Sequence, residues 1–246
     1  MSSQRGHGTQ TPPKPRHAMV FPPVPPPAPR SFWRELPVLL VVAFVLAFLV
    51  KTFLVQPFYI PSGSMEQTLQ VGDRVMVNKV AYRLGEVQRG EVVVFNGADS
   101  FTPESTVVAP TGAAGRLADW VGQLVGLAPP DEHDFVKRVI GVGGDEVRCC
   151  DKAGRITVNG VALDEPYLYP GDAPSEEQFD VVVPEGKLWV MGDHRSRSSD
   201  SRAHQGDPGG GFVPTDQVIG RAFAVVWPWS DAQLLSTPPA FAAIPS

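Results

Sequence analysis

A glycine-flanked serine, Ser64, is the residue of this 246-residue sequence best placed to act as a nucleophile. It stands in the run Pro-Ser-Gly-Ser-Met at residues 61–65. Glycine lets backbones approach closely and leaves a neighbouring hydroxyl accessible. A serine hydroxyl attacks a carbonyl group only when a base, usually histidine or lysine, removes its proton. The run alone favours a simple Ser/Gly turn between a membrane anchor and a domain, so a catalytic interpretation depends on partners found further along the chain.

Lys137 is the stronger candidate for the base because it interrupts an otherwise apolar strand pattern. The segment 134–141 reads Asp-Phe-Val-Lys-Arg-Val-Ile-Gly. Side chains alternate between the two faces of a strand, so Lys137 and Arg138 are predicted to point to opposite sides. At least one of the two cations is therefore expected among apolar neighbours. The simpler interpretation of the pattern alone is a pair of solvated cations on an edge strand.

Histidine offers a second choice of base. Two of the five histidines, His7 and His17, precede the long apolar run of the sequence. His194, in Met-Gly-Asp-His-Arg, would form a Ser/His/Asp set with Ser64 and Asp193. The residues around His194 are typical of a turn, and no motif orients its ring, so we favour the lysine.

The cysteine content predicts neither a long-range disulfide nor a metal site. Cys149 and Cys150 are the two cysteines, and because they are adjacent neither can pair with a distant part of its own chain. A disulfide between neighbours is strained, so we interpret the pair as structural or redox-labile rather than as a staple. Two thiols without a His/Cys cluster argue against a metal site. We expect no metal and no cofactor.

Charge is unevenly distributed along the chain, whose formal net charge is −5. Residues 1–35 contain five basic residues and one acidic residue, a net of +4, which leaves −9 for residues 36–246. A basic N-terminus followed by an acidic body argues against nucleic-acid binding. Basic flanks of a membrane helix are retained on the cytoplasmic side, so we predict a cytoplasmic N-terminus.

The composition divides the chain into four regions. Residues 1–35 are proline-rich and are predicted to be a disordered tail. Residues 36–55 are almost wholly apolar, and twenty helical residues rise about 30 Å, which matches the hydrocarbon core of a membrane. No small-residue cleavage site follows, so we predict an uncleaved transmembrane helix rather than a signal peptide. Residues 56–229 are predicted to form the catalytic domain and residues 230–246 a proline-rich C-terminal tail.

Short β-like runs separated by Gly, Asp and Asn dominate the sequence after residue 58. They are rich in Val and Ile, and turn pairs such as Asn159-Gly160 connect them. The runs are 74–80, 91–95, 134–142, 146–150, 155–158, 181–183, 187–191 and 218–226. The pattern predicts a mainly β domain built on an antiparallel sheet or barrel.

Residues 96–133 do not follow the strand pattern and are predicted to be an inserted, lid-like segment. Within it, residues 115–127 carry apolar side chains at helical spacing. Those side chains are Leu117, Trp120, Val121, Leu124 and Val125. We expect this amphipathic face to touch the membrane, although packing against its own domain fits the pattern equally well.

Several motifs along the chain together resemble those of the bacterial type I signal peptidases. The first comprises residues 61–65 with Thr68-Leu69, Gly72-Asp73 and residues 74–79. The others are residues 90–95, 137–141 with Gly144-Asp145, 192–195 with 198–202, and 211–214. They occur in the order of that family, after an apolar segment in the family's position. The resemblance covers residues 36–226.

The resemblance implies roles for individual residues. Ser64 resembles the nucleophile and Lys137 the general base, while Ser62 resembles the hydroxyl that joins the Ser64 N–H in the oxyanion hole. Ser198 resembles the hydroxyl that orients the lysine. The positions that resemble a structural pair near the site are Asp200 and Arg202, and those that resemble the lining of shallow substrate pockets are Phe58, Ile60, Leu69 and Val136. His194 departs from the family pattern, in which asparagine is common at this position. Ser196-Arg197 also departs from it, because an acidic residue and an asparagine are common there.

The activity implied is that of a membrane-bound serine endopeptidase with a Ser/Lys dyad, cleaving N-terminal signal peptides from exported preproteins after small residues. A lysine has a reference pKa of about 10.4, and burial among apolar groups lowers it toward the range in which the amine accepts a proton. The implied partners are secretory preproteins and the lipid bilayer. We expect a monomer that does not bind nucleic acid, with its catalytic domain on the extracytoplasmic side.

Two other function classes remain open at this point. A self-cleaving protease of the repressor type shares the Ser/Lys chemistry but requires a DNA-binding region. A membrane-tethered β domain that only binds partners requires no dyad at all.

Overall fold

The computed structural model describes residues 32–98, 100–101 and 133–245. Contacts divide the chain after Ala43 into two compact units. The predicted lid-like segment 96–133, including the amphipathic stretch 115–127, lies largely outside the described residues. The predicted disordered tail 1–35 lies outside them up to residue 31.

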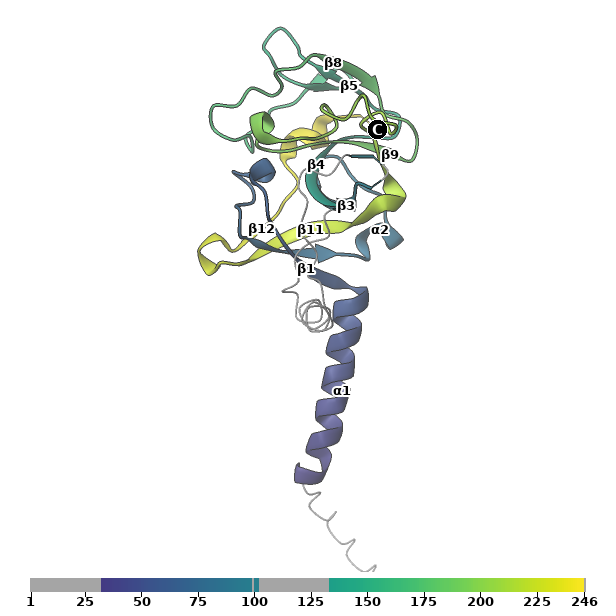
Figure 1. Cartoon of the computed structure of the whole chain (residues 1–246), viewed down its shortest axis with the longest axis vertical. Helices are drawn as coiled ribbons and strands as arrows, with labels where there is room; N and C mark the ends of the chain where they lie inside the picture. The colour runs from purple at the N-terminus through teal and green to yellow at the C-terminus, as the bar shows by residue number, and fades with distance from the viewer. Residues whose placement is uncertain (1–31, 99, 102–132, 246) are drawn as a thin grey trace, which may run out of the picture. The chain divides into compact units, whose positions relative to one another are not determined.

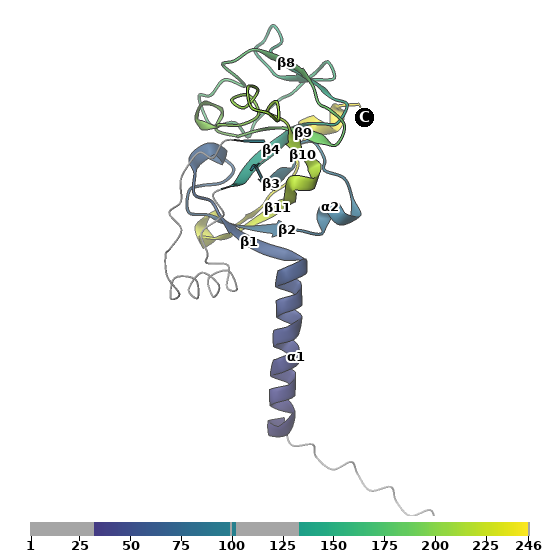
Figure 2. The same cartoon turned by 45° about the vertical axis from the view of Figure 1, so that its right-hand side comes forward.

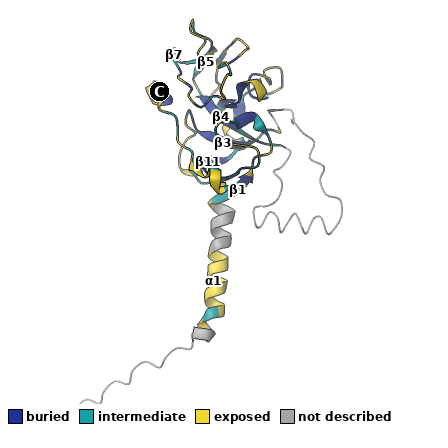
Figure 3. Cartoon of the chain, turned by 90° about the vertical axis from the view of Figure 1, so that its left-hand side faces the viewer, coloured by how far each residue is buried: buried dark blue, intermediate teal, exposed yellow. Residues whose placement is uncertain are grey.

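Helix α1 (Phe32–Phe53) occupies most of the predicted membrane segment. It starts four residues before the predicted range 36–55 and ends two residues before the end of that range. The side chains described along it, residues 35–46, are exposed except for half-buried Leu36 (Figure 3). In the part of the chain that the structure describes, no helix meets both the length and the hydropathy needed to cross a membrane.

The larger sheet carries the site and is antiparallel at every pairing between its strands (Figures 1 and 2). Its strands follow the order β1-β2-β11-β3-β4-β9-β10, and β12 pairs with β11. Their bounds are β1 Val55–Tyr59, β2 Arg74–Asn78, β11 Val218–Trp227, β3 Val92–Asn96, β4 Asp134–Val142, β9 Lys187–Met191, β10 Val213–Pro214 and β12 Gln233–Leu234.

A smaller four-stranded antiparallel sheet has the order β7-β6-β5-β8. Its strands are β7 Val161–Ala162, β6 Thr157–Val158, β5 Glu146–Cys149 and β8 Phe179–Val182. The other elements are helix α2 Ala81–Leu84 and the 3₁₀ turns η1 Gly63–Met65, η2 Arg195–Arg197, η3 Thr215–Gln217, η4 Trp229–Asp231 and η5 Pro239–Ala243. The prediction of a mainly antiparallel β fold is therefore confirmed.

Central strand β4 is the element on which the core is built (Figure 3). It lies between β3 and β9, and both Lys137 and Arg138 are buried. The alternative of two solvated cations on an edge strand is therefore wrong. The reason is that the neighbouring runs Val92–Asn96 and Lys187–Met191 both pair with β4 and leave it no free edge.

The predicted C-terminal tail contributes to the core. Phe241 and Ile244 are buried in the same apolar cluster as Trp189 of β9 and Val147 of β5. Two apolar residues among prolines give almost no periodic signal, so the sequence pattern does not indicate this packing.

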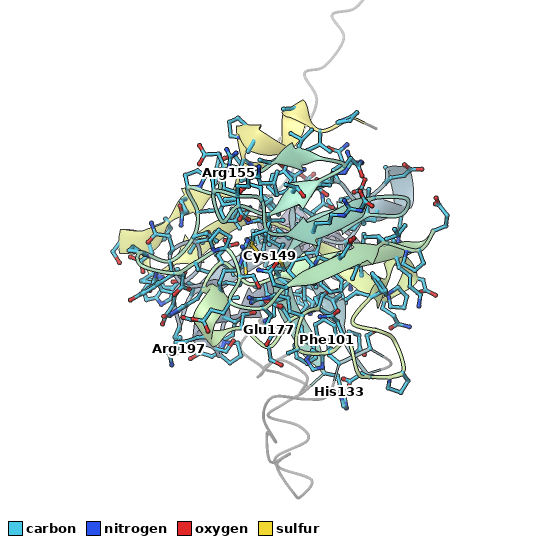
Figure 4. All side chains as sticks on the ribbon, turned by 90° about the horizontal axis from the view of Figure 1, so that it is seen from above. Phe101, His133, Cys149, Arg155, Glu177 and Arg197 are labelled. Atoms are coloured by element: carbon cyan, nitrogen blue, oxygen red, sulfur yellow. A yellow bond between two sulfur atoms is a disulfide. The ribbon has the colours of Figure 1, made fainter. Side chains whose placement is uncertain are left out.

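Cys149 and Cys150 form a disulfide with each other (Figure 4 labels Cys149). Cys149 ends β5 and is buried in the apolar cluster beneath the smaller sheet. The bridge closes no chain segment between distant residues, which agrees with the prediction that the pair is not a staple.

Candidate active site

Ser64 lies in the short turn η1, which is fixed at both ends. Before it, Ile60 exchanges main-chain hydrogen bonds with the segment at Gly72 and Asp73, at 2.9 Å each. Met65, within the turn, and Leu69, which follows it, are both buried in the apolar cluster beneath the turn. A turn anchored by buried side chains has little freedom to move, so the position of Ser64 is set by the core.

Lys137 of β4 reaches this serine directly. The Lys137 Nζ atom donates a hydrogen bond to Ser64 Oγ at 2.8 Å, and both side chains are buried. Lys137 is only 2% exposed, and its amine lies 6.0 Å from the centre of the Phe135 ring. Two residues 73 positions apart in the sequence therefore form one buried pair.

Ser62 lies at the edge of the same pair. Its Oγ atom is 3.4 Å from Ser64 Oγ, and the residue is half-buried. The two serine hydroxyls therefore lie side by side at the turn η1.

Arg138 points to the opposite side of β4, as the strand period predicts. Its guanidinium forms two hydrogen bonds with Asp193, at 2.8 and 2.6 Å, and a third with the Gly90 carbonyl at 2.8 Å. It also stacks over the Tyr167 ring at 4.1 Å. Burial opposes the guanidinium charge, but the Asp193 carboxylate outweighs this and raises the pKa of Arg138. Because Asp193 is engaged by Arg138, it does not serve a histidine.

The histidine alternative finds no support in the position of the His194 ring. The Nδ1 atom lies 2.8 Å from Glu66 Oε2, and the ring stacks on Tyr169 with centres 3.9 Å apart. The contact between His194 and Ser64 is made by the backbone, from the His194 N–H to the Ser64 carbonyl at 3.1 Å. The ring thus faces Glu66, whereas the Ser64 hydroxyl faces Lys137.

Asp200 and Arg202 form the buried ion pair that the resemblance implies, with two side-chain hydrogen bonds of 2.8 Å. Asp200 also accepts a hydrogen bond from the Gly192 N–H at 3.0 Å. Burial by itself raises the pKa of Asp200, but the Arg202 guanidinium and the Gly192 N–H together hold that pKa below its ordinary value. The pair therefore fixes the chain immediately after β9.

Ser198 lies beside the turn η1 that carries Ser64. A Cβ atom placed on Gly192 would be 2.3 Å from Ser198 Oγ and 2.4 Å from the Ser64 carbonyl oxygen. Only glycine fits between these two groups. The Ser198 hydroxyl is buried and has no hydrogen-bond partner among the described residues, so the structure does not join it to Lys137.

The four predicted substrate-contacting residues are close together but differ in exposure. Phe58, Ile60 and Leu69 are buried in one apolar cluster, and half-buried Val136 packs against it. Leu69 has no exposed surface at all. Val136 is therefore the only one of the four with a partly exposed side chain.

A third buried ion pair near the site, between Arg195 and Glu165, has no counterpart among the residues predicted from the sequence. Arg195 pairs with Glu165, donates to the Gly192 carbonyl at 2.9 Å, and donates to the Pro174 carbonyl at 2.6 Å. Tyr167 donates its hydroxyl to Glu165 at 2.7 Å. Arg195 belongs to a recognised motif, but Glu165 lies in an irregular segment where no pattern distinguishes it from a surface carboxylate.

Comparison with known proteins identifies the class to which this fold and site belong. A family model described as "Signal peptidase, peptidase S26" matches residues 33–227. Signal peptidase I of Mycobacterium tuberculosis is 44% identical over 223 residues, covering 83% of this chain and 76% of that protein. The probable signal peptidase I of Mycobacterium leprae is 42% identical over 228 residues, covering 82% and 78%. Signal peptidase IB of Staphylococcus aureus is 34% identical over 206 residues, covering 77% and 87%.

These matches define a hydrolase that acts on peptide bonds, a serine endopeptidase. The chain belongs to the bacterial type I signal peptidases of family S26.

Replacing Asp200 should change the response of the fold to acid. Because its folded-state pKa lies below the ordinary value, the Asp200 carboxylate contributes stability above that value and loses it as the pH falls through the folded-state pKa. Asp200→Asn should therefore lower the free energy of unfolding at pH 7, by about 3–5 kcal/mol, and flatten its fall in acid. Urea unfolding between pH 7 and pH 3 measures both effects.

The matched control is Asp180→Asn, which removes an exposed carboxylate paired with Arg148. It should leave the stability and its pH dependence nearly unchanged. If the Asp200→Asn protein lost stability in acid as steeply as the parent does, the lowered folded-state pKa of Asp200 would be contradicted.

Proposed function

We propose that the chain is a membrane-bound serine endopeptidase that uses Ser64 and Lys137 as its dyad to remove signal peptides from exported preproteins. The observation that carries this proposal is the buried 2.8 Å contact between Lys137 Nζ and Ser64 Oγ. The substrate class follows from the names of the relatives, which are signal peptidases.

Burial suits Lys137 to the role of general base. Removal from water disfavours the charged ammonium form of a lysine, and only the uncharged amine can accept a proton. In the proposed reaction the amine takes the Ser64 proton as Oγ bonds to the substrate carbonyl carbon. The resulting ammonium then gives that proton to the departing amine as the peptide C–N bond breaks. An ester at Ser64 remains, and Lys137 activates a water molecule that hydrolyses it.

The oxyanion is proposed to be held by the Ser64 N–H and the Ser62 hydroxyl. The short separation of the two serine oxygens, 3.4 Å, supports a role for Ser62. Removing one such donor typically slows the chemical step about 10²–10³-fold. Ser198, whose hydroxyl is buried beside the turn that carries Ser64, is proposed to orient the Lys137 amine when substrate is bound.

We propose that the substrate binds across Val136 in an extended conformation, so that alternate side chains of the substrate contact the surface at Val136. An extended peptide directs every second side chain to the same side. The small surface that Val136 offers above buried Phe58, Ile60 and Leu69 favours small residues at the cleavage position and small or aliphatic ones two positions earlier. Binding of this kind excludes a large side chain because the buried residues have no room to move.

The dyad is tested with the full chain in detergent and a secretory precursor as substrate. Ser64→Ala and Lys137→Met should each lower kcat by about 10³-fold or more, because the two groups act as a unit. Methionine keeps the volume and apolar contacts of the buried lysine stem, so the fold should survive. Ser196→Ala, an exposed serine that binds Asp172, should retain full activity.

Two further arms of the same assay decide between alternatives. His194→Ala should retain most of the activity, whereas its complete loss in a folded protein would restore the histidine as base. A precursor with phenylalanine before the cleaved bond should remain uncut, and equal cleavage of both precursors would overturn the proposed pocket. Full activity of Ser64→Ala would show that another nucleophile acts, and full activity of Lys137→Met would show that another base acts. Absence of cleavage by the parent itself would favour the non-catalytic β domain.

We propose that residues 36–55 anchor the chain in the bilayer, with the N-terminus in the cytoplasm and the catalytic domain outside. The proposal rests on the apolar sequence and on the charge of the preceding residues. A chain held at the membrane meets precursors that are held there too, which raises their effective concentration. We also propose that the chain acts as a monomer.

The anchor is tested by placing charges in it. Val41→Asp with Val45→Asp should release the full chain from membranes during alkaline extraction, because each central carboxylate opposes insertion by about 2.5–3.5 kcal/mol. Val182→Asp changes an equally exposed apolar residue of β8 and should leave the protein in the pellet. Retention of the double variant in the pellet would show that this segment is not the anchor.

A further inference from the structure

Three side chains outside the Ser64 site form a Ser/His/Asp series of their own. They are Ser199, His204 and Asp207, in the turn-rich segment between β9 and β10. The Ser199 Oγ atom lies 3.0 Å from His204 Nε2, and His204 Nδ1 lies 2.7 Å from Asp207 Oδ2. The proposed signal-peptide reaction uses none of the three.

The chemistry of the partners fixes the direction of these hydrogen bonds. An ionised carboxylate only accepts, so the Nδ1 atom of His204 must carry the proton that it shares with Asp207. In the neutral ring the Nε2 atom is then the acceptor, and the Ser199 hydroxyl donates to it. This is the arrangement in which a histidine takes the proton of an attacking serine and a carboxylate holds the ring in the required tautomer.

The ring is held in a fixed position. His204 is buried, and its ring lies flat against that of Phe101, with centres 4.2 Å apart and an angle of 11° between the planes (Figure 4 labels Phe101). The main-chain N–H of His204 donates to the Asp200 carbonyl at 3.3 Å, and the main-chain carbonyl of His204 accepts from the Asp207 N–H at 3.0 Å. The histidine is therefore preorganised by packing and by its own backbone.

Ser199 is less deeply buried than His204. Ser199 is half-buried, and the Asp207 side chain is 30% exposed. A reagent would have to reach the hydroxyl through the exposed part of Ser199, which requires no displacement of the imidazole. The segment is tightly turned, with hydrogen bonds from Ala203 and His204 to the Asp200 carbonyl, so it suits a small reagent better than an extended peptide.

We propose that Ser199 is a second activated nucleophile, independent of Ser64 and Lys137, that reacts with small acyl or phosphonyl electrophiles. With a fluorophosphonate, the Ser199 oxygen bonds to phosphorus while the P–F bond breaks. His204 takes the hydroxyl proton on Nε2, and fluoride leaves with the bonding electron pair. The ring then returns the proton to solvent, and no oxidant or reductant is needed.

The test uses the full-length Ser64→Ala protein in detergent, so that the first nucleophile is absent. The protein is treated with a small alkyl fluorophosphonate, and the labelled residue and its rate are determined by peptide mass spectrometry. Ser199 should be labelled much faster than Ser196, an exposed serine in the same protein that binds a carboxylate and no histidine. Labelling should slow as the pH is lowered, because a protonated imidazole cannot accept the serine proton.

Asp207→Asn is the sharpest variant because it keeps the shape of the side chain but no longer fixes the tautomer of His204. It should slow labelling of Ser199 by about 10²-fold or more, as the same change does in a serine protease triad. His204→Gln should slow it at least as much, and if that variant fails to fold, the Asp207→Asn rate decides. Labelling of Ser199 no faster than Ser196, or at the parent rate in Asp207→Asn, would overturn the proposal.

Discussion

Two neighbouring cations, Lys137 and Arg138, are buried on opposite faces of one central strand, and the rest of the site is arranged around that constraint. Burying an unpaired charge costs several kcal/mol, so each cation must be matched or neutralised. Arginine cannot lose its proton in a protein, and Arg138 accordingly has a carboxylate, Asp193, in a two-bond pairing. Lysine can lose its proton, and Lys137 faces a hydroxyl, that of Ser64. The different chemistry of the two side chains thus accounts for the different partners that they have.

The segment that follows β9 makes contacts that serve both faces of strand β4, the face of Arg138 and the face of Lys137 and Ser64. Asp193 binds the arginine, the Gly192 carbonyl and N–H bind Arg195 and Asp200, and the His194 N–H binds the Ser64 carbonyl. Several buried ion pairs in one short segment leave it few alternative conformations. The turn η1 with Ser64 is consequently held by apolar packing beneath it and by this hydrogen-bond network beside it. A site of this kind is preorganised, which is what stabilisation of a developing charge requires.

Much of the framework could be predicted from the sequence because it consists of regular strands. The ranges of β4 and β9 match the predicted runs 134–142 and 187–191, since both are largely apolar and each is followed by a glycine. Alternation along β4 also predicted that Lys137 and Arg138 point apart. Strand β1 was not predicted, because Val55 was assigned to the end of the apolar helix and residues 56–59 show no strand pattern of their own.

What could not be predicted depends on contacts between distant segments. The pairing of Glu165 with Arg195 joins two irregular segments, and the choice of Glu66 by the His194 ring follows from how two turns meet. Neither leaves a periodic signal in the sequence. The roles of Ser62 and Ser198 were suggested by family resemblance, and their positions beside Ser64 are now given by the structure.

The central claim, that the neutral amine of Lys137 is the base for Ser64, is tested most directly by changing the basicity of that amine alone. Lys137→Cys followed by aminoethylation in denaturant and refolding restores a side chain of lysine length in which a sulfur atom lowers the pKa of the amine. The native cysteines are joined to each other, so the introduced thiol is the one available for alkylation. Activity should be absent before aminoethylation and return after it, with the acidic limb of kcat/KM moved to lower pH. An acidic limb unchanged from that of the parent, or activity in the unmodified Lys137→Cys protein, would contradict the account.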